Sequence, residues 1–183
     1  MSGASTAQST KFVTTGRWIP EKGDAGQIFL SMAYWVTDDW SLGVDYRPLV
    51  DSLELTSTYR LISEDPNGWR PGVILGTSKE DFTDGGLELE SRAWFGTVSK
   101  ALPKIEPLDL SISPYAGAVW IHEFDDLRPL AGVNISHPFA SLMVQYSGTD
   151  THLTLSKSIT PQVSVSAIYW GLKYPGIGMR FRF

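Results

Sequence analysis

The chain has 183 residues, no cysteine, 42% hydrophobic residues and a formal net charge of −5. The length suits a single domain, and the lack of cysteine excludes disulfides, thiolate metal sites and a cysteine nucleophile. Nucleic-acid binders carry a basic patch, which this acidic sequence does not show, so we expect no nucleic-acid partner.

The chain begins with ten small and polar residues, and no apolar run approaches the roughly 20 residues of a spanning helix. We therefore expect a flexible polar tail over 1–10, followed by one domain over 11–183. The tail lacks the basic end and apolar stretch of a signal peptide. If the protein is exported, we expect a processed chain with its signal peptide removed and Met1 added or replaced.

Alternation of apolar and polar residues recurs along the chain with the period of two that is typical of strands. It is clearest over 40–47, 53–61, 87–95, 108–113 and 177–183, and weaker strands are predicted over 12–19 and 163–173. Turn-forming residues separate these runs at 20–26, 37–39, 48–52, 64–68, 78–86, 100–107, 122–126, 136–139, 148–150, 160–162 and 174–176. These turns divide the chain into about twelve strands at hairpin spacing.

The polar faces of these strands carry arginine and carboxylates but no lysine. Arginine forms forked hydrogen bonds with carboxylates and suits confined ion pairs, whereas water-exposed faces favour lysine and glutamate. A balanced set suits the inside of a small barrel, where an unpaired charge is costly. We predict ten lumen-lining residues: Asp45, Arg47, Glu54, Arg60, Glu88, Glu90, Arg92, Asp109, Arg180 and Arg182.

These patterns predict an all-β fold: a single closed antiparallel up-and-down transmembrane β-barrel of about 12 strands (10–12). Its apolar face would meet lipid. Tryptophan and tyrosine near the strand ends would form aromatic girdles at the membrane surfaces, although aromatic residues also favour strands in general.

The last seven residues, IGMRFRF over 177–183, resemble the C-terminal strand of bacterial outer-membrane β-barrel proteins. Residues 37–46 and 160–165 also resemble short periplasmic turns of such barrels. The resemblance implies an integral protein of the bacterial outer membrane, with the bilayer as its surroundings. It also implies that the outer-membrane insertion machinery recognises the last strand through Met179, Phe181 and Phe183.

In that family the strand number is even and both termini are periplasmic, which places the first turn outside the cell. The extracellular loops expected here are no longer than the periplasmic turns. This departs from porins, whose long outer loops constrict the pore.

Three functions remain open at this point. The first is a structural barrel or a narrow passive pore for small solutes, with a lumen that is either filled or wet. The equal number of predicted lumen arginines and carboxylates argues against strong ion selectivity. The second is a soluble β-barrel or sandwich that binds an apolar ligand or a partner, with its leucines and phenylalanines inward.

The third is an outer-membrane lipid hydrolase that uses His122 or His152 with a serine and a carboxylate. A rim histidine without a catalytic role is the plainer interpretation, so we do not expect an enzyme. A calcium loop over 81–86 competes with an ordinary solvated turn, and we expect no metal and no cofactor.

Overall fold

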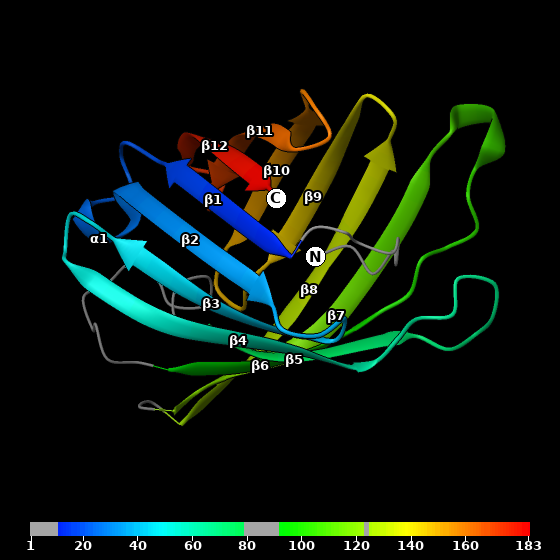
Figure 1. Ribbon diagram of the computed structural model, residues 1–183, viewed down its shortest axis with the longest axis horizontal. Coiled ribbons are helices and arrows are strands. Elements are labelled where there is room, and N and C mark those ends of the chain that lie inside the picture. Colours follow the sequence, from blue (N-terminus) through cyan, green and yellow to red (C-terminus); the bar gives the residue numbers. More distant parts are fainter. Residues whose placement is uncertain (1–10, 79–91, 123–124) are drawn as a thin grey trace.

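The computed structural model describes residues 11–78, 92–122 and 125–183. Within them, twelve strands form one closed antiparallel up-and-down barrel, in which each strand pairs with its neighbours in sequence and β12 closes on β1 (Figure 1). The prediction of a closed all-β barrel of about 12 strands is confirmed. No helix in these ranges is long and apolar enough to cross a bilayer.

The strands are as follows: β1 (Phe12–Trp18), β2 (Ile28–Trp35), β3 (Trp40–Arg47), β4 (Ser52–Ile62), β5 (Gly72–Ser78), β6 (Ala93–Ser99), β7 (Ser111–Ile121), β8 (Asp126–His137), β9 (Ala140–Tyr146), β10 (Thr151–Ser158), β11 (Val163–Trp170) and β12 (Tyr174–Arg182). Two short helices interrupt the turns: α1 (Asp24–Gln27) and the 3-10 helix η1 (Glu106–Leu108).

The seam between β1 and β12 is a full ladder that runs from Val13 opposite Arg182 to Trp18 opposite Ile177. Just beyond it, Phe12 and Phe183 exchange two backbone hydrogen bonds of 3.2 and 2.9 Å. If the strand pairs are followed once around the barrel, the path returns to β1 about 14 residues away from where it started. For twelve strands, this offset corresponds to a strand tilt of roughly 40° from the barrel axis and a backbone radius of roughly 12 Å.

The two open ends of the barrel differ. The first-turn rim comprises the turns 19–27, 48–51, 147–150 and 171–173 with the described part of 122–125. The terminal rim comprises Lys11, Phe183 and the loops 36–39, 63–71, 100–110, 138–139 and 159–162. Loops 63–71 and 100–110 reach furthest on the right of Figure 1.

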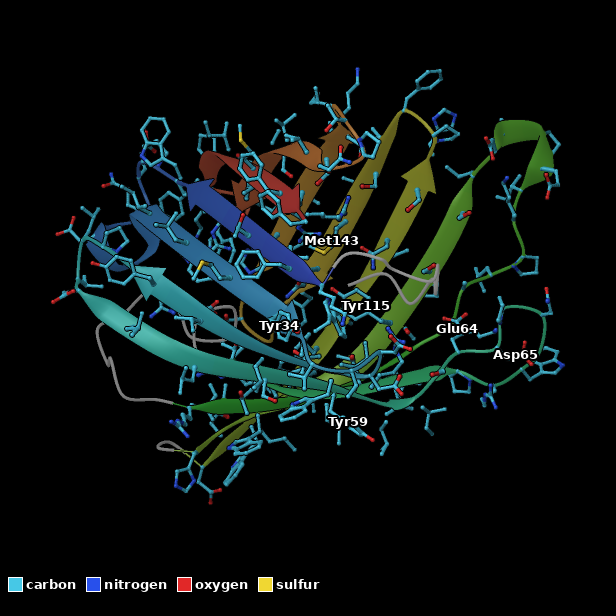
Figure 2. All side chains as sticks on the ribbon, viewed as in Figure 1. Tyr34, Tyr59, Glu64, Asp65, Tyr115 and Met143 are labelled. Atoms are coloured by element: carbon cyan, nitrogen blue, oxygen red, sulfur yellow. The ribbon has the colours of Figure 1, made fainter. Side chains whose placement is uncertain are left out.

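Those two loops are joined through Glu64, which is labelled with Asp65 in Figure 2. The Glu64 carboxylate accepts a hydrogen bond of 2.7 Å from the Ala101 amide and lies 3.4 Å from Lys100 Nζ. Lys100 also donates a hydrogen bond of 2.6 Å to the Asp65 carbonyl. This buried carboxylate therefore gives the terminal rim a fixed shape on the β4–β7 side.

Two predicted boundaries are wrong. The last turn was predicted over 174–176, but Pro175 and Gly176 lie in β12 and the chain turns at 171–173, where Gly171 and Leu172 have φ of 59° and 53°. The strand predicted over 108–113 begins only at Ser111, because Pro107 belongs to η1 and Asp109 ends it in a left-handed conformation. In the strand predicted over 87–95, residues 87–91 lie outside the described ranges and β6 starts at Ala93.

Candidate functional site

The two faces of the barrel wall separate charge from hydrocarbon. The register pairs Asp45 with Glu54 on one face, and pairs Tyr46 with Leu53 on the other. Burial identifies the inner face: Asp45 and Arg47 are 8% and 7% exposed, whereas Leu53 and Leu55 are 68% and 73% exposed. Alternation then carries the assignment along each strand and across each pair.

Six of the ten predicted lumen residues lie on the inner face: Asp45 and Arg47 in β3, Glu54 and Arg60 in β4, and Arg180 and Arg182 in β12. Arg47 and Glu54 form an ion pair of 3.2 Å, with side chains only 8% and 11% exposed. Arg60 lies 3.5 Å from Asp39 at the terminal rim. Glu88 and Glu90 lie outside the described residues, and Arg92 precedes β6 on the exposed rim.

Asp109 lies on no strand. It follows η1 in the loop 100–110 and forms an ion pair of 2.5 Å with Lys104. The hydrogen bond and the negative charge of Asp109 both raise the pKa of Lys104. Asp109 therefore belongs to the terminal rim, and its apparent alternation with Leu108 and Leu110 comes from a helical turn.

Three charged residues of the inner face were not predicted from the sequence, namely Arg17 in β1 and Asp126 and Arg128 in β8. Arg17 shares the face of Thr15 and Ser31, and its guanidinium lies over the rings of Phe29 and Trp170. Asp126 and Arg128 pair at 2.6 Å. Both segments have mixed faces in the sequence, so alternation alone could not assign them.

With these residues included, the described strands place six arginines and three carboxylates on the inner face. The arginines are Arg17, Arg47, Arg60, Arg128, Arg180 and Arg182, and the carboxylates are Asp45, Glu54 and Asp126. The equal balance of signs expected from the sequence does not hold for these strands, whose inner face is positive.

The half of β10 and β11 nearer the terminal rim carries hydroxyls on its inner face, and we call this part the hydroxyl wall. Ser156 and Ser166 lie opposite each other with Oγ atoms 2.8 Å apart, and Ser158 and Ser164 do the same at 3.2 Å. Ser164 in turn lies opposite Arg180 in the register. The hydroxyl wall therefore borders directly on the arginines of β12.

Two inward aromatic rings lie flat against glycines of the neighbouring strand. A Cβ atom on Gly76 would lie 2.6 Å from the ring of Phe95, and one on Gly132 would contact the Tyr115 ring. Such pairing of an aromatic residue with a strand glycine keeps the ring along the wall. These rings thus take up less of the centre of the barrel than rings pointing inward would.

An apolar cluster fills part of the interior between β5 and β8. Ala93, Val119 and Ile121 are fully buried there, with Phe95 and Leu130 nearly so. Ala93 and Ile121 are the residues of this cluster nearest the first-turn rim. The interior therefore has an apolar side, which lies across the barrel from the arginines of β1 and β12 and borders Asp126 and Arg128 of β8.

His152 and Ser147 form a buried pair at the first-turn rim. His152 Nε2 lies 3.1 Å from Ser147 Oγ, and its ring stacks on Trp170 at 4.0 Å. The Gly171 amide donates a hydrogen bond of 2.9 Å to Nδ1, so neutral His152 carries its proton on Nε2. A base that activates serine needs Nε2 free, with its Nδ1–H donating to an acceptor. The hydrogen bonds of His152 therefore do not activate Ser147, and they join turns 147–150 and 171–173.

The other two histidines are exposed. His122 packs edge-on against Trp120, and His137 accepts a hydrogen bond from the Phe139 amide in the tight turn between β8 and β9. No group of three or more histidine, aspartate and glutamate side chains suited to a metal ion occurs in the residues that the structure describes. The candidate calcium loop over 81–86 lies outside them.

Outward aromatic side chains at the first-turn rim point their polar edges toward that rim. Tyr46 reaches Asp51 at 3.4 Å, Trp120 reaches Asp125 at 3.1 Å, and the Tyr146 hydroxyl donates to the Gly148 carbonyl at 2.8 Å. Tyr59 projects outward near the opposite end (Figure 2). Met179, Phe181 and Phe183 of the predicted insertion motif alternate with the two arginines, and Met179 and Phe183 are 44% and 67% exposed.

No protein-family model matches the sequence, and no curated protein matches it. What the barrel does must therefore be inferred from its own two faces.

Proposed function

We propose that this chain is an integral outer-membrane β-barrel that offers small solutes a narrow passive path across the bilayer. The observation that carries the proposal is the composition of the outer face. Along the described strands that face holds no aspartate, glutamate or arginine, and its only titratable nitrogen side chains are His137 and Lys157, both close to the terminal rim.

A face of this kind suits hydrocarbon better than water. It exposes leucine, isoleucine and methionine from adjoining strands, including Leu42, Leu55, Leu75, Leu155, Ile177 and Met179. Tryptophan and tyrosine border this belt, as girdle residues of transmembrane barrels do, and those at the first-turn rim turn their polar edges toward it. The soluble alternative expects the opposite orientation, with the leucines inside and the arginines outside.

The inner face supports a path rather than a solid plug. Arg180 is exposed although it points inward from β12, so water reaches it inside the barrel. The hydroxyls of β10 and β11 belong to small side chains, and the rings of Phe95 and Tyr115 lie along the wall, so both occupy little of the centre of the barrel. Twelve strands give a width between that of small filled barrels and that of the large aqueous porins.

The first test is refolding into liposomes, followed by electrophoresis with and without boiling. We expect the unboiled protein to migrate differently from the boiled protein, to resist protease and to float with the lipid. Single-channel recording in a planar bilayer then tests the path. A protein that stays soluble and monomeric without detergent would overturn the membrane assignment, and a folded barrel without conductance would overturn the pore.

A further inference from the structure

The inner face of the seam carries a line of positive charge from one rim to the other. Arg182 and Arg180 follow each other on the inner face of β12, and Arg17 lies on β1 one inward position further along, beside Gly178. At the first-turn rim the Lys22 ammonium lies 3.7 Å from the Trp170 ring, and the Arg17 guanidinium lies 4.4 Å from the same ring. We call these four residues the cationic track.

No described residue neutralises the charges of the two arginines of β12. Among the residues that the structure describes, neither Arg180 nor Arg182 has an acidic partner or a hydrogen bond from its side chain. The carboxylate that shares the inward row of Arg180 is Asp45, three strands away across Thr15 and Ser31. At about 4.8 Å per strand, this separation is too long for an ion pair.

Two like charges on alternate residues of one strand repel each other at a spacing of about 6.6 Å. A protein that uses arginine only to close its lumen would pair each one, as Arg47 is paired with Glu54. Unpaired guanidinium groups beside water are instead ready to take a ligand, and their forked donors match carboxylate and phosphate oxygens.

The neighbouring hydroxyls complete an oxyanion site. Ser164 lies opposite Arg180 on β11, Ser158 lies opposite Ser164 on β10, and Thr15 lies opposite Arg180 on β1. One inward row thus presents a guanidinium with the Ser164 and Thr15 hydroxyls on either side and Ser158 beyond Ser164. Because one of the Ser158 and Ser164 hydroxyls donates to the other, one proton of that pair remains for a bound oxygen, and Thr15 has another.

We propose that Arg180 and Arg182, with the Ser164 hydroxyl, bind small oxyanions that carry carboxylate or phosphate groups, and that these two arginines make the barrel selective for anions. The inference rests on the proposed pore for its transport half only, because binding at the site needs no conductance. Arginine keeps its charge at all physiological pH values, so the selectivity should not change between mildly acidic and neutral solutions.

Binding is tested with inorganic phosphate as the probe, by ³¹P NMR titration of the barrel refolded in micelles. We expect saturable broadening of the phosphate resonance. The double variant Arg180→Gln/Arg182→Gln should weaken the apparent affinity roughly tenfold or more, because charge-assisted hydrogen bonds are lost. The matched control Lys157→Gln/Lys173→Gln removes the same charge from the outer face and the exposed turn, and it should bind as the unaltered protein does.

Selectivity is tested by the reversal potential in a potassium chloride gradient. For the unaltered protein we expect a reversal potential whose sign shows preference for chloride over potassium. The lysine control should give nearly the same reversal potential, and the double arginine variant should give one close to zero. Arg180→Glu/Arg182→Glu should reverse the sign. Heat-modifiable mobility shows that each variant is folded before it is compared.

The outcomes separate the two proposals. Phosphate binding without conductance would keep the oxyanion site and overturn the pore. Conductance without phosphate binding, or with cation preference, would keep the pore and overturn the oxyanion site. Equal loss of binding in both double variants would show an effect of net charge alone and would also overturn the site.

Discussion

Arg47 has the most confined ion pair among the described residues, since it and Glu54 are nearly excluded from water. Removing one partner takes the ion pair from a charge that stays nearly buried. We expect Arg47→Leu to lower the free energy of unfolding by about 3 kcal/mol. Urea titration in micelles, followed by tryptophan fluorescence, measures the change.

The double variant Arg47→Leu/Glu54→Leu is the control for this prediction. It removes both charges and should lie closer to the unaltered protein than either single variant does. If the single and double variants lose equal stability, the pair is too well hydrated for its burial to matter.

The inner charges also show which residues could be assigned from sequence. Asp45, Arg47 and Glu54 lie in segments whose apolar positions alternate without a break, so their face was predictable. Arg17 and Arg128 were missed because Gly16 and Pro129 occupy outward positions beside them, so each arginine has a clearly apolar outward neighbour on one side only.

The sequence could predict that Ser147 and His152 lie close together, but it could not predict the role of the pair. The two residues flank a short turn, so their approach follows from the local sequence. The role of the pair depends on the Gly171 amide, which comes from a different hairpin and fixes the tautomer of His152. Contacts of that kind depend on the register between strands, which the sequence does not state.

At the scale of the element, β4 is suited to a test of the surroundings of the barrel because its outward leucines are among the most exposed. A charge placed on a lipid-facing strand costs about 2–4 kcal/mol near the bilayer centre, and nearly nothing in water. We expect Leu55→Arg to lower the free energy of unfolding in liposomes by about 2 kcal/mol or more.

The control is Leu108→Arg, which makes the same change in η1 of the loop 100–110. Leu108 is 61% exposed and Leu55 is 73% exposed, so both side chains start with similar access to their surroundings. The loop variant should be close to neutral. Equal and small effects of both variants would indicate that water surrounds β4.

The strands could be predicted because alternation of apolar and polar residues repeats along the chain. The boundaries at 174–176 and 108–110 could not be predicted in the same way. Pro175–Gly176 has the composition of a turn, yet Pro175 pairs with Tyr169 inside the ladder. The segment 108–110 alternates like a strand, yet the neighbouring Pro107 starts a helical turn. In the first case the pairing of β11 with β12 decides the boundary, and in the second the helical turn at Pro107 decides it. Neither follows from the composition of the segment itself.

At the scale of the whole molecule, Phe183 lies where the barrel closes, and its ring centroid is 6.1 Å from that of Phe12. Phe183→Ala keeps the two backbone hydrogen bonds and removes the ring that the insertion machinery is expected to recognise. We therefore expect normal refolding into liposomes but a several-fold lower yield of membrane-inserted protein in cells, measured by protease-resistant, heat-modifiable bands.

Phe139→Ala is the matched control, because Phe139 is a 75% exposed phenylalanine in a turn at the same rim. Its yield in cells should not change. A Phe183 variant that inserts normally in cells would contradict the role of the last strand as an insertion motif.

Charge is also segregated at this scale. The chain contains 20 acidic residues, but only Asp45, Glu54 and Asp126 lie on the described strands. The net charge of −5 therefore comes from residues outside the described strands and hides the positive inner face. Overall composition could not predict ion preference, because only the strands decide which charges face the lumen.

The seam gives the chain an assembly order. β1 and β12 are partners at opposite ends of the sequence, so their ladder has the largest sequence separation in the molecule and forms at the greatest loop-closure cost. Every shorter nascent chain has two unpaired edges, which invite aggregation until a chaperone or the membrane covers them. Arg180 and Arg182 enter on the last strand and meet Arg17 only when the cylinder closes. A half-assembled molecule therefore has neither a closed wall nor a cationic track. The pairing of β1 with β12 would close the wall against leakage and, in the same step, complete the path for solutes.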